Sequence, residues 1–269
     1  GWDGCSGYHY SDSIVYGFSH THLSGTGVSD YGDVLLMPTS PGPFMYNGAE
    51  KGVDKGYASR FSKSSEIAEP GFYKVFLSDY NIDVELTTTK RAGFHKYQFD
   101  SAASRHVVLD LEHRDKRIDW HIEREDSTKL KGYRVSDAWA KEQHIYFYIE
   151  FSEPFMENVP DEYWAKGFYY FGQSEGTELL VKVGISAVSI ENAKANVEAE
   201  IPHWDFEQTK KEAQDAWNKQ LAKIEVEGEE KDKVKFYTSL YHTMIAPNLY
   251  SDVNGDYRGM DMKIHNIGE

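Results

Sequence analysis

Alternation of apolar and polar side chains with a period of two dominates residues 33–188. Because successive side chains of a β-strand point to opposite faces, such a pattern predicts a strand. The clearest alternating ranges are 107–112, 118–123, 145–151 and 181–185. Weaker ones are 72–77, 84–89, 94–99, 131–136 and 167–172. About ten strands separated by short turns favour a large antiparallel β-sandwich over a parallel α/β sheet.

The hydrophobic period changes to that of a helix after residue 188. Ser189 is placed to cap a short helix that ends before Pro202, and Asp205 to cap a longer one. Gln208 stands three residues after Asp205, the spacing of a capping box. The apolar face predicted for the second helix is Phe206, Ala213, Trp217, Leu221 and Ile224.

A third helix is expected from about residue 230 to 246, with Pro247 ending it. Its predicted buried residues are Val234, Tyr237, Tyr241 and Met244. The fold class is therefore mainly β, and the predicted units are a sandwich at 1–188, a helical linker at 189–228 and the start of a helical domain at 229–269.

Charge and composition narrow the class of partner. The net charge of -15 disfavours nucleic acid and anionic membranes as partners. A neutral polar ligand such as a sugar suits the 19 Tyr and 6 Trp, whose rings offer flat apolar faces with polar edges. No apolar run approaches the roughly twenty residues of a transmembrane helix. The single Cys5 excludes an internal disulfide, and a buried packing thiol is the expected role.

The first 33 residues contain seven glycines, several aromatics and almost no aliphatic side chains. Such a stretch cannot bury enough apolar area to form core, so it predicts either a polar ligand site or a capped surface loop. His20 and His22 could ligate a metal with Asp30 or Asp33. Hydrogen bonds to a polar ligand, or within the glycine-rich loops, are the favoured alternative. Trp2 fits no periodic face and is expected to touch the ligand.

Two other groups of residues look like sites but have simpler explanations. Asp252, Asn254 and Asp256 resemble the start of an EF-hand, but Tyr257 and Lys263 stand where that loop needs Gly and Glu, so a turn with local capping is expected. The acidic pairs Glu153 with Glu157 and Asp110 with Glu112 are interpreted as exposed acids rather than a catalytic pair. The tryptophans expected in the core are Trp120, Trp204 and Trp217.

The opening residues resemble a known family. Residues 1–8 (GWDGCSGY), 17–27 (GFSHTHLSGTG) and 30–33 (DYGD) resemble the N-terminal domain of glycoside hydrolase family 92. This is a family of bacterial exo-acting α-mannosidases, often specific for α-1,2 linkages. Residues 241–243 (YHT) and 248–259 (NLYSDVNGDYRG) resemble the opening of its catalytic domain.

The resemblance implies an inverting, calcium-dependent enzyme with a β-sandwich, linker helices and an (α/α)6 barrel whose first helix is present here. Inversion needs a carboxylic acid and a carboxylate base about 6.5–9.5 Å apart. In the family both, with the Ca²⁺ ligands, lie in the helical domain, here expected beyond Glu269. The chain is therefore expected to be the N-terminal part of the enzyme, without catalytic residues and without a nameable metal ligand.

The resemblance also implies that the sandwich forms one wall of an interdomain site. Trp2 would be an aromatic wall for the terminal mannose, which Ca²⁺ would bridge through its 2- and 3-hydroxyls. The implied substrate-binding residues are Trp2, Asp3, Ser6, Gly7, Tyr8, His20 and His22. The implied partners are mannose-containing glycans and the remainder of the catalytic domain, in a secreted or periplasmic bacterial protein. The alternatives are a non-catalytic carbohydrate-binding β-sandwich module and a purely structural scaffold.

Overall fold

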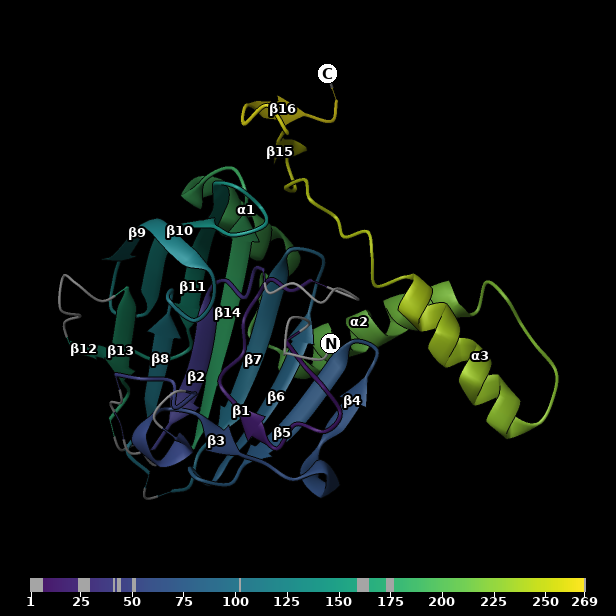
Figure 1. The fold of residues 1–269 in the computed structure, drawn as a ribbon, viewed down its shortest axis with the longest axis horizontal. Helices are drawn as coiled ribbons and strands as arrows, with labels where there is room; N and C mark the ends of the chain where they lie inside the picture. Colours follow the sequence, from purple (N-terminus) through teal and green to yellow (C-terminus); the bar gives the residue numbers. More distant parts are fainter. Residues whose placement is uncertain are drawn as a thin grey trace.

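Two antiparallel sheets form the body of the protein (Figure 1). The computed structural model describes residues 7–23, 30–40, 42, 45–49, 52–101, 103–158, 165–172 and 177–268. In spatial order, the eight-stranded sheet contains β4 (Ile67–Glu69), β5 (Phe72–Leu77), β6 (Ile82–Thr88), β7 (Ala92–Gln98), β14 (Glu178–Ser186), β11 (Gln143–Phe151), β10 (Lys129–Asp137) and β9 (Lys116–Arg124). The four-stranded sheet contains β12 (Met156–Asn158), β13 (Lys166–Tyr170), β8 (His106–Asp110) and β2 (Leu35–Thr39).

Smaller elements complete the fold. The strands β1 (Ile14–Val15) and β3 (Ser59–Arg60) pair with each other, and so do β15 (Asp256–Arg258) and β16 (Ile264–Asn266). The short 3-10 helices are η1 (Val53–Lys55) and η2 (Lys63–Ser65). The α-helices are α1 (Ile190–Glu200), α2 (Phe206–Leu221) and α3 (Glu230–Thr243). None of the helices in the described ranges is long and apolar enough to cross a membrane.

The main core lies between the two sheets. In β11 the alternate residues Phe147, Ile149 and Phe151 are buried against side chains of the four-stranded sheet such as Leu109 and Tyr169. Interdigitating inner faces are the defining feature of a sandwich. The predicted mainly-β sandwich followed by helices is confirmed.

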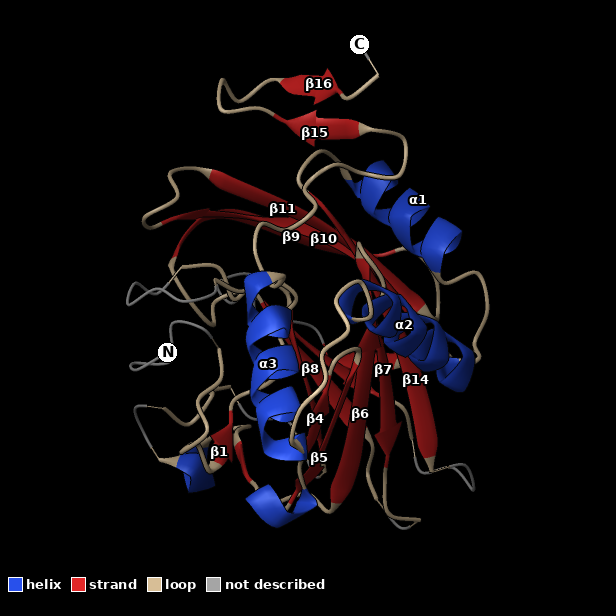
Figure 2. Ribbon diagram, turned by 90° about the vertical axis from the view of Figure 1, so that its right-hand side faces the viewer, coloured by secondary structure: helices blue, strands red, loops and turns tan. Residues whose placement is uncertain are grey.

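The outer face of the eight-stranded sheet is covered by α1 and α2, at the right of Figure 2. Phe94 and Tyr148 of the sheet pack there against Ala193 and Val197 of α1 in a second apolar cluster. Gly184 allows the helix to lie close, because a Cβ at that position would be 2.2 Å from the Ala193 carbonyl oxygen. The sheet thus has buried side chains on both faces, with the helices fixed to one of them.

Both predicted helix caps are present, but the capping box is not. The Ser189 hydroxyl accepts from the Asn192 amide, and the Asp205 carboxylate accepts from the Gln208 amide. The Gln208 side chain does not return to Asp205; it donates to Glu212 one turn further on, at 2.8 Å. In a capping box the Gln208 side-chain oxygen would accept from the Asp205 amide, but that amide donates to Nδ1 of His203 at 3.3 Å.

The prediction for the third helix is wrong in two respects. It ends at Thr243, three residues early, and none of its residues is buried within the described structure. Val234 is 56% exposed. The rings of Tyr241 and of Trp217 in α2 have centroids 4.7 Å apart, and the Tyr237 hydroxyl donates to the Ile224 carbonyl just after α2 at 3.1 Å. Tyr237, Tyr241 and Met244 are therefore partly buried, whereas Val234 faces solvent.

Two further predictions about burial are corrected. Trp204 is 39% exposed rather than core, because it lies in the turn between α1 and α2. Asp110 is buried rather than exposed, because it pairs with the Lys166 ammonium at 2.9 Å and accepts from the Tyr57 hydroxyl.

Candidate functional site

The opening segment runs alongside β2 as an irregular extra strand of the four-stranded sheet. Isolated bridges join Phe18 to Leu36 and His22 to Tyr31, and the His20 amide donates to the Asp33 carbonyl at 2.9 Å. Of the residues predicted to bind substrate, Gly7, Tyr8, His20 and His22 are in this described part. Trp2, Asp3 and Ser6 lie outside the described residues.

His20 is part of a chain of hydrogen bonds inside the sandwich. Its Nδ1 lies 2.6 Å from the Val34 carbonyl oxygen, and its Nε2 lies 3.0 Å from Nε2 of His95. Burial lowers the pKa of His20 to about 4, so the ring is neutral at pH 7. Nδ1 then donates to the carbonyl, and Nε2 accepts from His95. His95 Nδ1 in turn accepts from the Tyr97 hydroxyl at 2.7 Å.

Because His20 and His95 are neutral in the folded protein, the stability of the fold should decrease in mild acid. The pKa of His20 falls from 6.5 in the unfolded chain to about 4 in the folded one, and burial also lowers the pKa of His95. The unfolded state therefore binds more protons between these values, so stability is present above pH 6.5 and is lost as the pH falls toward 4. The shift of His20 corresponds to roughly 3 kcal/mol. Urea unfolding at pH 7.5 and 4.5 checks this: a His20→Asn variant should lose less stability between these pH values than the wild type, and equal losses would contradict the assignment.

His22 and Gly7 fit each other closely. The imidazole Nε2 of His22 lies 2.7 Å from the Ser19 hydroxyl, and burial lowers the pKa of His22. Gly7 has φ of 75°, and a Cβ there would lie 2.4 Å from Cδ2 of that ring. A side chain at position 7 would therefore be strained and would displace the imidazole. Gly7 supplies backbone space rather than a side-chain contact.

Tyr8 is held by an ion pair at the start of the eight-stranded sheet. Its hydroxyl donates to Glu66 at 3.1 Å and accepts from the Lys63 ammonium at 3.0 Å. The same ammonium lies 4.5 Å from the centroid of the Tyr8 ring. These contacts orient the ring, one edge of which stays exposed to solvent.

Asp33 carries a buried carboxylate that several side chains of the site contact. It is 1% exposed and forms an ion pair with the buried Arg134 of β10. The Gln143 amide and the Thr21 hydroxyl each donate to its carboxylate at 2.6 Å. Asp33 thereby ties the opening segment to β10 and β11, so the two sheets are linked at the site by one buried carboxylate.

The backbone around Asp33 adopts unusual conformations. Tyr31, Val34 and Asp115 have φ of 70°, 53° and 59°, a region that costs energy for any residue with a Cβ and most for the β-branched valine. Burial, and then the charge of Asp30, raise the pKa of Asp115 to about 6. Strained backbone and a carboxyl with a raised pKa gather at one end of the sandwich, which is typical of functional sites.

A second carboxylate, Asp252, anchors the segment after α3 to the sandwich. It is 3% exposed and accepts from the Ser186 hydroxyl at 2.7 Å and from the side-chain amides of Asn192 at 2.9 Å and Asn196 at 2.7 Å. The Arg91 guanidinium adds a bond to the Ser251 carbonyl oxygen at 2.6 Å. We call these four side chains with Asp252 the Asp252 clasp.

The Asp252 clasp brings Tyr250 close to the opening segment. Burial raises the pKa of Tyr250, and the nearby Tyr31 adds to the rise. Tyr250 and Leu249 nevertheless keep more than half of their surface exposed. Tyr250 therefore lies close enough to Tyr31, two residues before Asp33, to feel its charge, and its own ring keeps open surface.

The residues near the site do not fit Ca²⁺ as ligands. The oxygens of Asp252 accept from three N–H and O–H donors, and Asp256 accepts from the amides of Asn192, Asn254 and Asn266. Oxygens engaged by donors are not arranged around a cation. Within the described ranges no three His, Cys, Asp or Glu side chains converge on a common point. The predicted turn with local capping at 252–256 is confirmed by the bond from the Asp256 amide to Asn254, at 3.0 Å.

Comparison with known proteins identifies the family. Residues 1–186 match the glycosyl hydrolase family 92 N-terminal domain, and residues 192–269 match the glycosyl hydrolase family 92 catalytic domain. The chain belongs to glycosyl hydrolase family 92. The resemblance predicted from the opening and C-terminal motifs is confirmed.

Solved structures of other family 92 proteins share the fold. A family 92 α-mannosidase from Bacteroides thetaiotaomicron is 30% identical with a TM-score of 0.89, over 98% of this chain and 38% of that one. The same enzyme has been solved in complex with mannoimidazole. A family 92 inverting mannosidase from the same organism is 25% identical with a TM-score of 0.82, over 96% of this chain and 36% of that one.

A curated relative extends the comparison to another organism. An uncharacterized secreted glycosidase of Arthroderma benhamiae is 27% identical, and the match covers 94% of this chain and 38% of that protein. The family 92 chain therefore spans about two fifths of the length of the relatives it matches.

Sequence reasoning missed the residues that organise the site. Asp33 was considered only as a possible metal ligand, and Asp252 only as a turn residue. Their partners Arg134 and Asn196 lie far away in sequence, so no local spacing connects them. The one available signal was the presence of an Asp within each family motif.

Proposed function

We propose that this chain is the N-terminal part of a calcium-dependent, inverting exo-α-mannosidase that removes α-linked mannose, with α-1,2 the expected linkage, from glycans. The observation that carries the proposal is the Asp252 clasp, which fixes a segment of the family 92 catalytic-domain match to β14 of the sandwich through Ser186 and to α1 through Asn196. The open aromatic surface at Tyr31 and Tyr250 would then be one wall of an interdomain site. The solved relatives named as α-mannosidases, one of them in complex with mannoimidazole, support this choice of substrate.

The opening segment would contact the substrate in this proposal. Trp2 supplies an aromatic wall for the terminal mannose, and Asp3 and Ser6 orient hydroxyl groups. Gly7 and Tyr8 shape the path by which the substrate reaches the site. Gly7 is packed on His22, and Tyr8 is held by Lys63. Both nitrogens of His20 have internal partners, which supports a role in ordering the loop. His22 has Ser19 as its partner and lies next to Gly7.

The catalytic acid, the base and the Ca²⁺ ligands are proposed to come from the remainder of the catalytic domain. The described residues do not fit the cation, so no step is assigned to it here. The division into a sandwich at 1–188, a linker at 189–228 and a barrel start at 229–269 stays a prediction. Secretion or a periplasmic location is proposed, supported by the relative named as a secreted glycosidase.

The test of the proposed function uses the whole enzyme that contains this chain. With α-1,2-mannobiose, proton NMR should show release of mannose first as the β-anomer, because inversion changes the configuration of the α-linked sugar. A calcium chelator should abolish release, and added Ca²⁺ should restore it. Absence of mannose release would overturn the assignment, and first release of the α-anomer would overturn inversion.

A non-catalytic carbohydrate-binding module is the second candidate, favoured by the exposed aromatic side chains. Such a module binds mannose without hydrolysing it. A site shared between two domains should instead bind mannose weakly when only one of the domains is present. Titration calorimetry of this chain with mannose distinguishes them: tight binding supports the module, and heat absent at millimolar mannose supports the shared site.

A further inference from the structure

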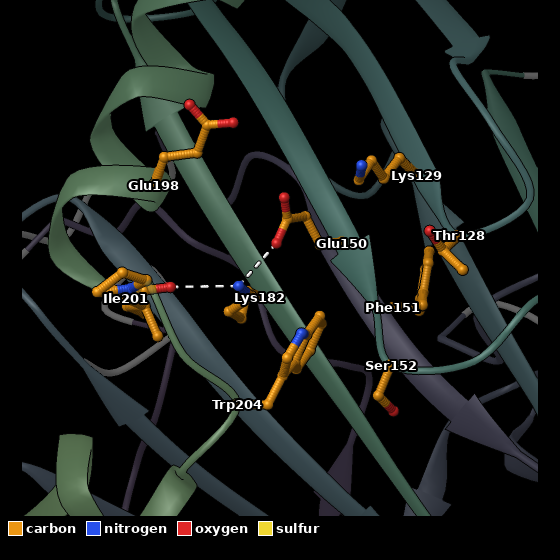
Figure 3. Close-up of a pocket in the computed structure, with 10 residues that line it drawn as sticks. Thr128, Lys129, Glu150, Phe151, Ser152, Lys182, Glu198, Ile201 and Trp204 are labelled. Atoms are coloured by element: carbon orange, nitrogen blue, oxygen red, sulfur yellow. Dashed lines mark hydrogen bonds and ion pairs between the residues drawn. The ribbon is translucent and has the colours of Figure 1, made fainter.

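A hollow on the outer face of the eight-stranded sheet is separate from the site described above. Its volume is about 570 Å³, and its lining includes Glu150 of β11, Lys182 of β14 and Trp204 (Figure 3). Glu150 and Lys182 are paired across the two strands, and the next residues along, Ile149 and Val183, face the core. His95 belongs to that inner face, since it pairs with Val181. The hollow and the His20–His95 chain are therefore on opposite faces of the sheet.

Trp204 is held rigidly at the rim of this hollow, although it is partly exposed. The Lys182 ammonium lies 4.2 Å from the centroid of the Trp204 ring, and Phe94 packs edge-on at 6.2 Å. Lys182 is itself buried, with Glu150 at 2.7 Å and the Ile201 carbonyl oxygen at 3.2 Å (Figure 3). An indole fixed by a buried cation loses little conformational entropy when a ligand contacts it.

The rest of the lining offers hydrogen bonds of both kinds with balanced charge. The positive charges of Lys129 and Lys182 are balanced in number by the negative charges of Glu150 and Glu198. The Ser152 oxygen accepts from the Leu180 amide at 3.0 Å, so its hydroxyl hydrogen remains available to donate. Only one carboxylate oxygen of Glu150 is engaged by Lys182. A flat aromatic surface surrounded by fixed donors and acceptors suits a neutral ring with several hydroxyl groups.

We propose that the Trp204 hollow binds one pyranose unit of a glycan, with the C–H face of the sugar on the indole and its hydroxyls on Glu150, Ser152 and Lys129. The volume lies within the range of about 300–1,000 Å³ typical of small-molecule sites. The net charge of -15 favours a neutral sugar over an anionic one. That the sugar is a mannoside rests on the proposed function; that it is a pyranose rests on the hollow alone. The site would hold a second branch of a large glycan away from the interdomain site.

The experiment is a titration of this chain with methyl α-mannoside and, separately, with methyl α-glucoside, followed by the indole signals in NMR. A dissociation constant in the millimolar range is expected for the wild type, and Trp204→Ala should weaken binding about tenfold, a loss of about 1.4 kcal/mol. Trp204→Phe should retain most of the affinity, because a ring remains. Trp139→Ala is the matched control, since Trp139 is also exposed but does not line the hollow.

The outcomes separate this inference from the proposed function. Binding of either sugar that depends on Trp204 supports the pyranose site, and preference for the glucoside would remove the mannoside from it. Equal affinities of the wild type and Trp204→Ala would overturn the site even if the whole enzyme releases mannose. If Trp204→Ala lowers the melting temperature, Lys129→Met tests the same hollow at a partly exposed residue whose ammonium pairs with Asp126 at 3.3 Å. Unchanged affinity in that variant would contradict the proposed hydroxyl contact.

Discussion

Replacing Asp33 with alanine should lower the free energy of unfolding by about 3–5 kcal/mol, the range for removing one partner of a buried ion pair. The variant leaves the guanidinium of Arg134 buried without its carboxylate and removes the acceptor of Gln143 and Thr21. Urea unfolding followed by far-UV circular dichroism at pH 7.5 measures the change.

The matched control for Asp33 is Asp54→Ala. The carboxylate of Asp54 also pairs with an arginine, Arg60 at 2.6 Å, but its side chain is 81% exposed. Exposed pairs contribute about 0–1 kcal/mol, so the control should unfold close to the wild-type midpoint. Equal midpoints for Asp33→Ala and the wild type would mean that the buried pair does not hold the opening segment.

Replacing Asp252 with alanine should release residues 250–268 from the sandwich and from α1 while the sandwich stays folded. The change removes the acceptor of three donors, on Ser186, Asn192 and Asn196, of which the first and last are buried. Because hydrogen bonds to a charged group contribute about 1.5–3 kcal/mol each and buried donors would be left unpaired, local opening should become at least about a hundredfold more frequent. Hydrogen exchange of residues 250–268 should accelerate by that factor.

Asp261→Ala is the control in the same segment. Asp261 is exposed, and its carboxylate accepts from its near neighbours His265 and Lys263. Exchange at the Asp252 clasp should therefore stay at the wild-type rate in this variant. Acceleration confined to Asp252→Ala, with β11 and β14 still protected, supports the clasp; the same rates in both variants would contradict it.

Local signals in the sequence were enough for most of the body of the fold. Strands such as β5 and β11 could be predicted from the alternation of their side chains. The helix caps at Ser189 and Asp205 could also be predicted, because each is formed by residues three positions apart. The strand β2 was missed because all five of its residues are buried, so it shows no alternation. Its Pro38 also argues against a strand, yet it is tolerated because β2 ends its sheet.

The candidate site could be located from its motifs but not assembled from them. The partners of His20 and Asp33 lie 75 and 101 residues away, in strands that fold over the opening segment. The exposure of Trp204 depends likewise on how α1 and α2 are joined over the sheet. Such contacts are set by tertiary packing, so the sequence predicted which residues matter at the opening without predicting what each one touches.

The central claim is that the opening segment of the sandwich forms one wall of a mannose site. The most direct test is kcat/KM for α-1,2-mannobiose in the whole enzyme with Trp2→Ala, compared with the wild type. Loss of an aromatic wall that contacts the sugar should lower kcat/KM by at least about tenfold, or about 1.4 kcal/mol. Wild-type kcat/KM in Trp2→Ala would contradict the claim.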